Sequence, residues 1–111
     1  MSYDLRIVAP GQVDVASIRE LLVSSDGVEQ LGEDLIWSGE AVNATFVLDA
    51  DEIDVGLTSD DAAPEILRRE FLSVLELASR VAAMVGAPVE DVQLGRALRP
   101  ADEDAVRSFA G

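Results

Sequence analysis

Residues 45–58 read TFVLDADEIDVGLT, and this stretch decides the fold class. In its second half apolar residues alternate with acidic or small ones, so that every second residue from Ile53 to Leu57 shares one face. Such alternation is typical of a strand with one buried and one solvated face. We therefore predict two strands, 45–49 and 52–58, which a tight turn joins into an antiparallel pair.

A long helix follows this pair. Asp60 and Asp61 can cap its first turn, Pro64 suits the first helical position, and apolar residues recur at helical spacing until Gly86. This spacing predicts the main core helix. Its buried stripe is expected to consist of Leu67, Phe71, Val74, Leu75, Ala78, Val81, Ala82 and Val85.

The exposed side of this helix carries opposite charges four residues apart. Glu65 precedes Arg69 at this spacing, and Glu76 precedes Arg80. Residues four apart are neighbours on a helix surface, so we expect two ion pairs here.

Weaker patterns complete the chain and predict a single α+β domain over residues 1–111. The expected order is β-α-β-β-β-α-β-α, which favours a two-layer sandwich of a mainly antiparallel sheet with helices on one face, ferredoxin-like or related. The remaining elements are a strand at 5–9, a helix at 14–24 capped by Asp14, a turn-like segment at 26–33, a strand from Leu35 to about Gly39, an edge strand at 89–94, and a short helix after Pro100 that buries Val106 and Phe109.

The chain contains neither cysteine nor histidine. This excludes disulfides, thiolate nucleophiles and cysteine-based zinc sites, and it removes the commonest general base and metal ligand. A serine nucleophile would also lack a lysine to activate it, because all eight basic residues are arginine. We therefore predict no enzyme, no catalytic residues, no metal and no cofactor. The absence of a long apolar run and of a secretory signal pattern predicts a cytoplasmic protein.

Three patterns suggest other chemistry, and each lacks a required part. The acidic run 49–54 has Ile53 and Asp54 where a calcium-binding loop needs an oxygen ligand and a glycine. Paired carboxylates can hydrolyse glycosides, but this short chain has few aromatic residues on which sugars could stack. Gly11 follows the first strand where a phosphate loop would lie, yet a single glycine in acidic surroundings does not indicate one.

Charge is the most informative feature of the sequence. The net charge is −14, and residues 20–67 hold 13 of the 22 acidic residues and no basic residue. Such a segment repels nucleic acid and anionic membranes and attracts basic surfaces through a long-range field. Concentrating like charge costs stability, so a basic protein partner is a reasonable explanation of this arrangement.

Both ends of the chain resemble small bacterial α+β proteins, some of which are similar to immunity proteins encoded beside toxins. The resemblance lies in the opening Met1-Ser2-Tyr3-Asp4-Leu5 and in residues 89–96, VEDVQLGR, where Glu90 and Val92 depart from the usual pattern. It implies a compatible fold and permits an immunity role, and it provides no catalytic residues to carry over.

We therefore predict an acidic protein-binding module, such as an immunity protein or an inhibitor of a nucleic-acid-acting protein. Homo-oligomeric assembly, for example a homodimer, and binding of a small ligand between sheet and helices are the alternatives. Trp37 is expected either in the core or as an anchor for a partner. The predicted partner-binding residues are Trp37, Glu40, Asp49, Asp51, Glu52, Asp54, Asp60 and Asp61.

Overall fold

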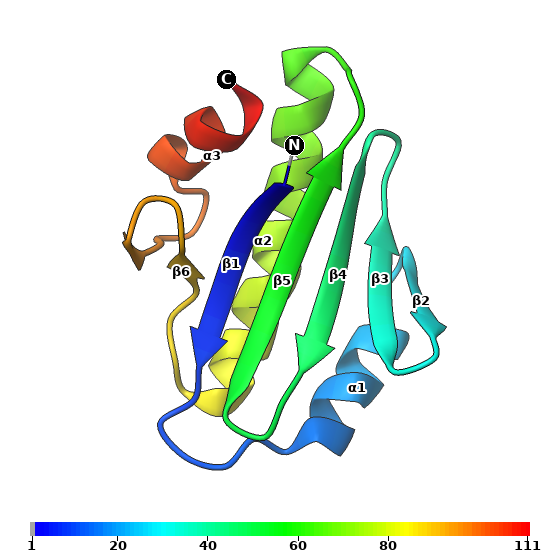
Figure 1. The fold of residues 1–111 in the computed structure, drawn as a ribbon, viewed down its shortest axis with the longest axis vertical. Coiled ribbons are helices and arrows are strands. Elements are labelled where there is room, and N and C mark those ends of the chain that lie inside the picture. Colours follow the sequence, from blue (N-terminus) through cyan, green and yellow to red (C-terminus); the bar gives the residue numbers. More distant parts are fainter. Residues whose placement is uncertain (1) are drawn as a thin grey trace.

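The computed structural model describes residues 2–111, and these residues form a seven-stranded antiparallel sheet and three helices (Figure 1). The α+β class predicted from the sequence is confirmed. The strands are β1 (Ser2–Val8), β2 (Val28–Leu31), β3 (Asp34–Ser38), β4 (Val42–Leu48), β5 (Glu52–Ser59), β6 (Glu90–Asp91) and β7 (Arg96–Ala97). The helices are α1 (Val15–Val23), α2 (Pro64–Val85) and α3 (Glu103–Ala110).

The strand order is β2-β3-β4-β5-β1-β6-β7, and every neighbouring pair is antiparallel. β4 and β5 form the hairpin that the alternating stretch predicts, with Phe46 opposite Val55. β1 then inserts between β5 and β6, with Leu5 opposite Val55 on one side and Asp91 on the other. The first strand of the chain is therefore central in the sheet.

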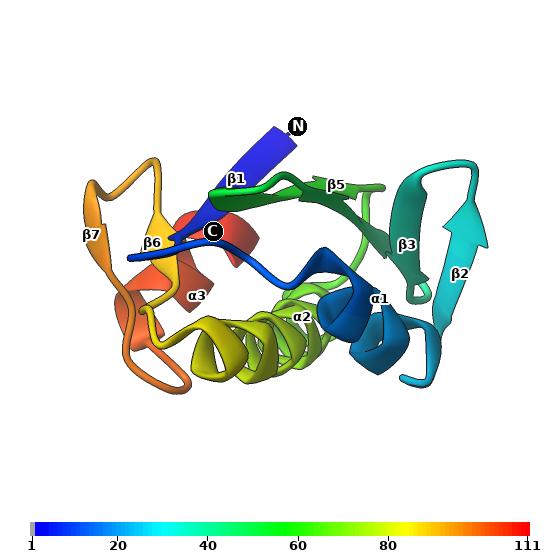
Figure 2. The same cartoon turned by 90° about the horizontal axis from the view of Figure 1, so that it is seen from below.

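All three helices lie on the same side of the sheet (Figure 2). α1 begins at the side chain of Asp14, which accepts a hydrogen bond from the backbone N–H of Ser17, as the capping pattern predicts. α2 crosses behind the central strands, and its apolar stripe meets the inward side chains of the sheet. Tyr3, Phe71 and Phe109 pack together where β1, α2 and α3 meet, with ring centroids 4.9–5.7 Å apart.

The structure corrects two parts of the predicted secondary structure. Residues 26–33, predicted as a turn, contain β2, whose side chains are mostly exposed and so lack the apolar alternation that marks a strand. The predicted edge strand 89–94 is instead the short strand β6, which a turn connects to β7. β2 is an edge strand, and β6 has two residues and lies next to the edge strand β7, so neither is long or apolar enough to show a clear sequence pattern.

Both predicted ion pairs on α2 are wrong. Arg69 binds Glu40 of the β3–β4 loop, with Nη2 3.3 Å from Oε2, in place of Glu65. Within residues 2–111 no carboxylate oxygen lies within 4.0 Å of the Arg80 guanidinium, Glu76 included. Exposed pairs on a helix gain only a few tenths of a kcal/mol, about as much as the side chains lose in freedom.

Among residues 2–111, none of the helices combines the length and the apolar composition that crossing a membrane requires.

Candidate partner-binding surface

The helices leave one face of the sheet uncovered. Leu5, Val55, Phe46 and Leu35 are cross-strand neighbours, each at most 1% exposed, and they point toward the helices. Side chains alternate along a strand, so the residues between them point to solvent on the other side. We call this surface the open face. It consists of Asp4, Arg6 and Val8 of β1, Glu29 and Leu31 of β2, Asp34, Ile36 and Ser38 of β3, Asn43, Thr45 and Val47 of β4, Glu52, Asp54, Gly56 and Thr58 of β5, and Glu90 of β6.

The open face is strongly acidic. Arg6 is its only basic residue, opposite Asp54 on one side and Glu90 on the other. Its guanidinium lies 3.3 Å from the Glu90 carboxylate and 3.9 Å from that of Glu52. The acidic residues of the open face are Asp4, Glu29, Asp34, Glu52, Asp54 and Glu90. One cation thus serves six carboxylates, so the face keeps a negative potential over several strands.

Like charges on the open face affect each other. Partial burial of Glu52, together with its neighbour Asp54, raises the pKa of the Glu52 carboxyl above its ordinary value of 4.5. Arg6 acts in the opposite direction and does not offset this effect. The charged form of Glu52 is therefore destabilised in the free protein. A cationic group brought to this surface would stabilise that charged form.

The open face also exposes apolar side chains among the carboxylates. Val8, Leu31 and Val47 are 46%, 57% and 40% exposed, and Val47 is the cross-strand neighbour of Asp54. Single exposed apolar residues are common on protein surfaces. Here they share one face with the acids, which is the mixture of apolar contact and polar surround found in protein interfaces.

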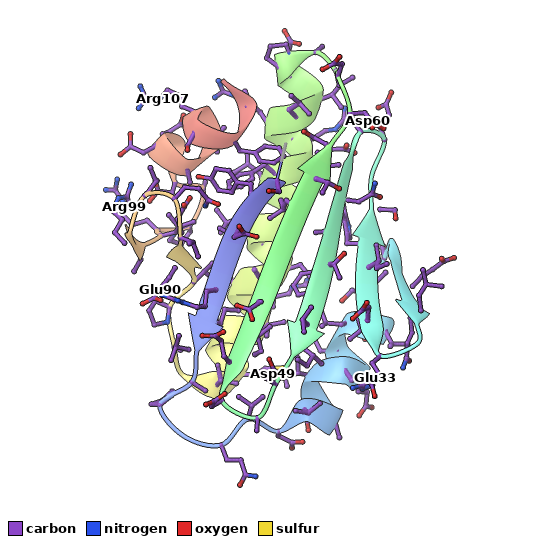
Figure 3. The ribbon with its side chains drawn as sticks, viewed as in Figure 1. Glu33, Asp49, Asp60, Glu90, Arg99 and Arg107 are labelled. Carbon is purple, nitrogen blue, oxygen red and sulfur yellow. The ribbon has the colours of Figure 1, made fainter. Side chains whose placement is uncertain are left out.

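The structure brings four of the eight predicted partner-binding residues together. Asp49 and Asp51 lie in the β4–β5 turn, where the Asp49 N–H donates to the Glu52 carbonyl at 2.9 Å. Glu52 and Asp54 continue from this turn onto the open face. This group lies at the lower end of the sheet in Figure 3, where Asp49 is labelled.

The other four predicted residues lie elsewhere. Asp60 and Asp61 are in the β5–α2 loop at the opposite end of the sheet (Figure 3). Glu40 forms an ion pair with Arg69, which partly neutralises its charge. Trp37 points to the helix side, because it alternates with the outward Ile36, and it packs partly against the core. The eight predicted residues thus do not form one patch.

Sequence reasoning missed four acidic residues of the open face, namely Asp4, Glu29, Asp34 and Glu90. Asp4 and Glu90 lie outside the cation-free segment, and the pairing of β1 with β5 and β6 brings them beside it. A signal for Asp4 was present, since it alternates with the buried Tyr3 and Leu5 as Asp54 alternates with Ile53 and Val55.

Three further carboxylates are buried, and each holds a loop in place. Glu70 accepts hydrogen bonds from the backbone N–H groups of the β3–β4 loop. Asp91 accepts from the hydroxyl of Tyr3 and Asp102 from the guanidinium of Arg96. Burying a charge is costly unless it is hydrogen-bonded, and these partners meet that requirement. Among residues 2–111 no cluster of three acidic residues has a geometry that could hold a metal ion.

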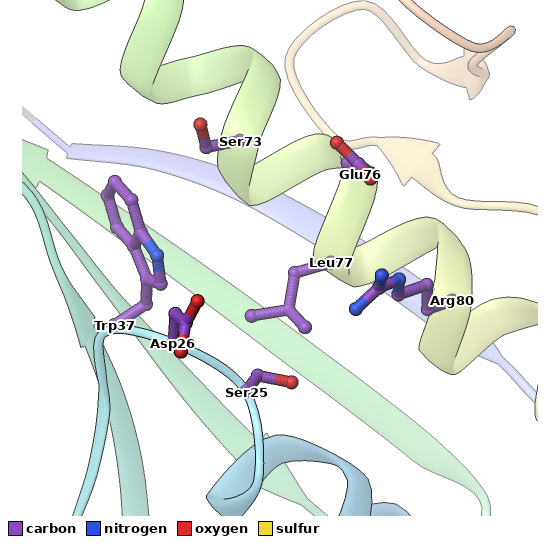
Figure 4. A pocket seen from close by; sticks show the side chains of 7 residues that line it. All are labelled: Ser25, Asp26, Trp37, Ser73, Glu76, Leu77 and Arg80. Atoms are coloured by element: carbon purple, nitrogen blue, oxygen red, sulfur yellow. The ribbon is translucent and has the colours of Figure 1, made fainter.

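A groove of about 360 Å³ lies on the helix side, between β3, α2 and the turn after α1 (Figure 4). Trp37 forms one wall, and Leu77 and Arg80 of α2 form the other. The groove is separate from the open face, because Trp37 points to the opposite side of the sheet from Ile36.

No family model matches the chain, and no curated protein and no solved structure is similar to it.

Proposed function

We propose that this protein is a non-catalytic binding module that docks on a basic protein through the open face of its sheet. The observation that carries the proposal is the presence of six carboxylates and one guanidinium on a sheet face that the helices of residues 2–111 leave uncovered. Complementary potentials steer two proteins together and speed their association at low salt. The exposed Val8, Leu31 and Val47 supply apolar contact within the same surface.

A nucleic-acid-acting protein is the partner class that fits best. Its cleft is basic because it binds phosphates, and an inhibitor must present negative charge to occupy it. The carboxylates of the open face are spread over several strands, as phosphates are spread along a nucleic acid strand. An immunity protein for a nuclease toxin requires this chemistry, and we propose that role for the protein. We also propose that it acts in the cytoplasm.

For the fold we propose the ferredoxin-like two-layer class. β1, α1, β4, β5, α2 and β6 follow the β-α-β-β-α-β order of that class, and their strands are arranged as β4-β5-β1-β6. In this assignment the β2–β3 hairpin extends one edge, and β7 with α3 extends the other.

The test is to measure binding of a panel of purified basic nuclease domains by calorimetry, with their nuclease activity as a second readout. The variant Asp4→Asn, Asp34→Asn, Asp54→Asn removes three charges from the open face. The control Glu20→Gln, Glu65→Gln, Glu76→Gln removes three exposed charges elsewhere. We expect at least one domain to bind with an affinity that falls steeply with salt, and the open-face variant to lose about tenfold or more while the control loses little.

Two outcomes contradict the proposal. Equal losses in both variants would mean that only net charge matters and that the open face is no specific site. If no domain binds and light scattering shows a stable dimer that the open-face variant disrupts, homo-oligomeric assembly replaces the proposed function.

A further inference from the structure

The groove beside Trp37 has the size of a small-molecule site. Its volume of about 360 Å³ lies at the lower end of the range for ligand pockets. The indole of Trp37 lies on one side and the buried Leu77 on the other, and the remaining lining side chains are polar or charged (Figure 4). A flat molecule could lie between them and stack on the indole.

Arg80 supplies an anion-binding group in this groove. Within the described residues its guanidinium has no carboxylate within 4.0 Å, although Glu76 lies one helical turn away. Figure 4 shows the guanidinium directed toward Leu77. A guanidinium presents parallel N–H donors that match the two oxygens of a carboxylate.

The groove also contains two carboxylates. Asp26 lies on the side of Trp37, and Glu76 lies on α2 (Figure 4). Together with Arg80 they give the groove a net charge of −1, which disfavours ligands with two negative charges, such as phosphate monoesters. The same carboxylates favour an ammonium group.

Gly27 keeps the aromatic wall in place. Its φ of +84° is a conformation that favours glycine, and a Cβ atom there would lie 3.1 Å from Nε1 of Trp37. The backbone of Gly27 also accepts a hydrogen bond from the N–H of Ser38 at 3.0 Å. The loop that carries Asp26 is thereby tied to the strand that carries Trp37.

From these groups we infer that the groove binds a free α-amino acid with an aromatic side chain. The ligand's carboxylate pairs with Arg80, its ammonium with Asp26 or Glu76, and its ring stacks on Trp37. This ligand satisfies both signs of charge and the apolar wall at once. The site lies on the helix side of the sheet and is independent of the proposed docking surface.

The chain contains one tryptophan, and this residue lines the groove, so its fluorescence responds to a ligand bound there. The experiment titrates the protein with L-phenylalanine, and with phenylacetate and phenethylamine, which lack the ammonium and the carboxylate respectively. We expect a saturable change in Trp37 emission with L-phenylalanine. Each analogue should bind at least about tenfold more weakly than L-phenylalanine, since each loses a charge-assisted hydrogen bond. Amide NMR shifts of residues 25–27 in the same titration check that the ligand sits in the groove.

Variants separate specific recognition from ring stacking. Arg80→Gln should weaken binding of L-phenylalanine by about tenfold and leave binding of phenethylamine unchanged. The double variant Asp26→Asn, Glu76→Gln should also weaken binding of L-phenylalanine by about tenfold, but it should not weaken binding of phenylacetate. The matched control is Arg19→Gln, on α1 and outside the groove. The inference is overturned if L-phenylalanine causes no saturable change, if all three compounds bind equally, or if Arg80→Gln and Arg19→Gln have the same effect.

Discussion

Gly39 and Glu70 are in direct contact, although thirty-one positions separate them: a Cβ atom at position 39 would overlap Oε2 of Glu70. The carboxylate is buried and accepts the backbone N–H groups of Glu40, Ala41 and Val42 at 2.5, 2.7 and 3.0 Å. α2 thereby anchors the loop that leads from β3 into β4. The contact requires glycine at position 39 and a carboxylate at position 70.

We expect Gly39→Ala to lower the free energy of unfolding by about 1–3 kcal/mol, because the added methyl group must displace the Glu70 carboxylate or the Trp37 ring. Glu70→Gln should cost a similar amount, because its amide would face an N–H donor where an oxygen now accepts. Urea unfolding measures both. Glu76→Gln, on the exposed side of the same helix, is the control, and an equal loss in that variant would contradict the assigned role of Glu70.

Asp102 should govern part of the acid stability. Arg96 binds its carboxylate through two N–H groups at 2.9 and 3.0 Å, and this guanidinium holds the pKa of Asp102 well below its ordinary value of 3.8. A carboxyl whose pKa is lower in the folded state stabilises the protein above 3.8 and loses this contribution as the pH falls below it.

Asp102→Ala should therefore lower the free energy of unfolding at neutral pH by about 2 kcal/mol or more, because it also removes the cap of α3. The variant should also lose less of its remaining stability than the wild type as the pH falls. Chemical denaturation at neutral pH and below 3.8 measures both effects. Asp104→Ala is the comparison, since Asp104 is an exposed partner of the same arginine. An unchanged acid profile in Asp102→Ala would show that other carboxyls govern it.

Tyr3 should titrate at unusually high pH. Burial and the neighbouring Asp91 raise the pKa of Tyr3 from 10.0 to about 12. The unfolded chain loses this proton first, so stability should decrease as the pH rises from 10.0 toward 12. The chain has one tyrosine, and ultraviolet absorption therefore follows its ionisation directly, with the urea-unfolded protein as reference. Equal titration midpoints in the two states would contradict the buried Tyr3–Asp91 contact.

Neutralising Glu52 should stabilise the free protein. Its raised pKa means that the folded state binds the proton more tightly than the unfolded chain, so the ionised carboxylate opposes folding at neutral pH. We expect Glu52→Gln to raise the melting temperature at neutral pH and the gain to disappear as the pH falls through the raised pKa. Glu76→Gln removes the same net charge at another site and should raise the melting temperature less. Equal gains would assign the effect to net charge alone.

The main strands and the long helix could be predicted because their patterns are local. Residues 52–58 alternate along the chain, and the stripe from Leu67 to Val85 repeats at helical spacing. β2 could not be predicted, because an edge strand with exposed side chains shows no such period. For the candidate site, the sequence identified Glu52 and Asp54, but the cation-free segment also contains Asp60 at the other end of the sheet.

The amino-acid pattern alone predicts the main strands and helices, the α+β class and the excess of negative charge, since these depend on composition and on residues a few positions apart. Which charges share a surface depends on how the strands and helices pack. Pairing of β1 with β5 and β6 places Asp4 and Glu90 on the same face as Asp54, and packing of α2 on the β3–β4 loop buries Glu70 and directs Arg69 to Glu40. These contacts join residues 28 to 86 positions apart, and no short-range pattern encodes such separations.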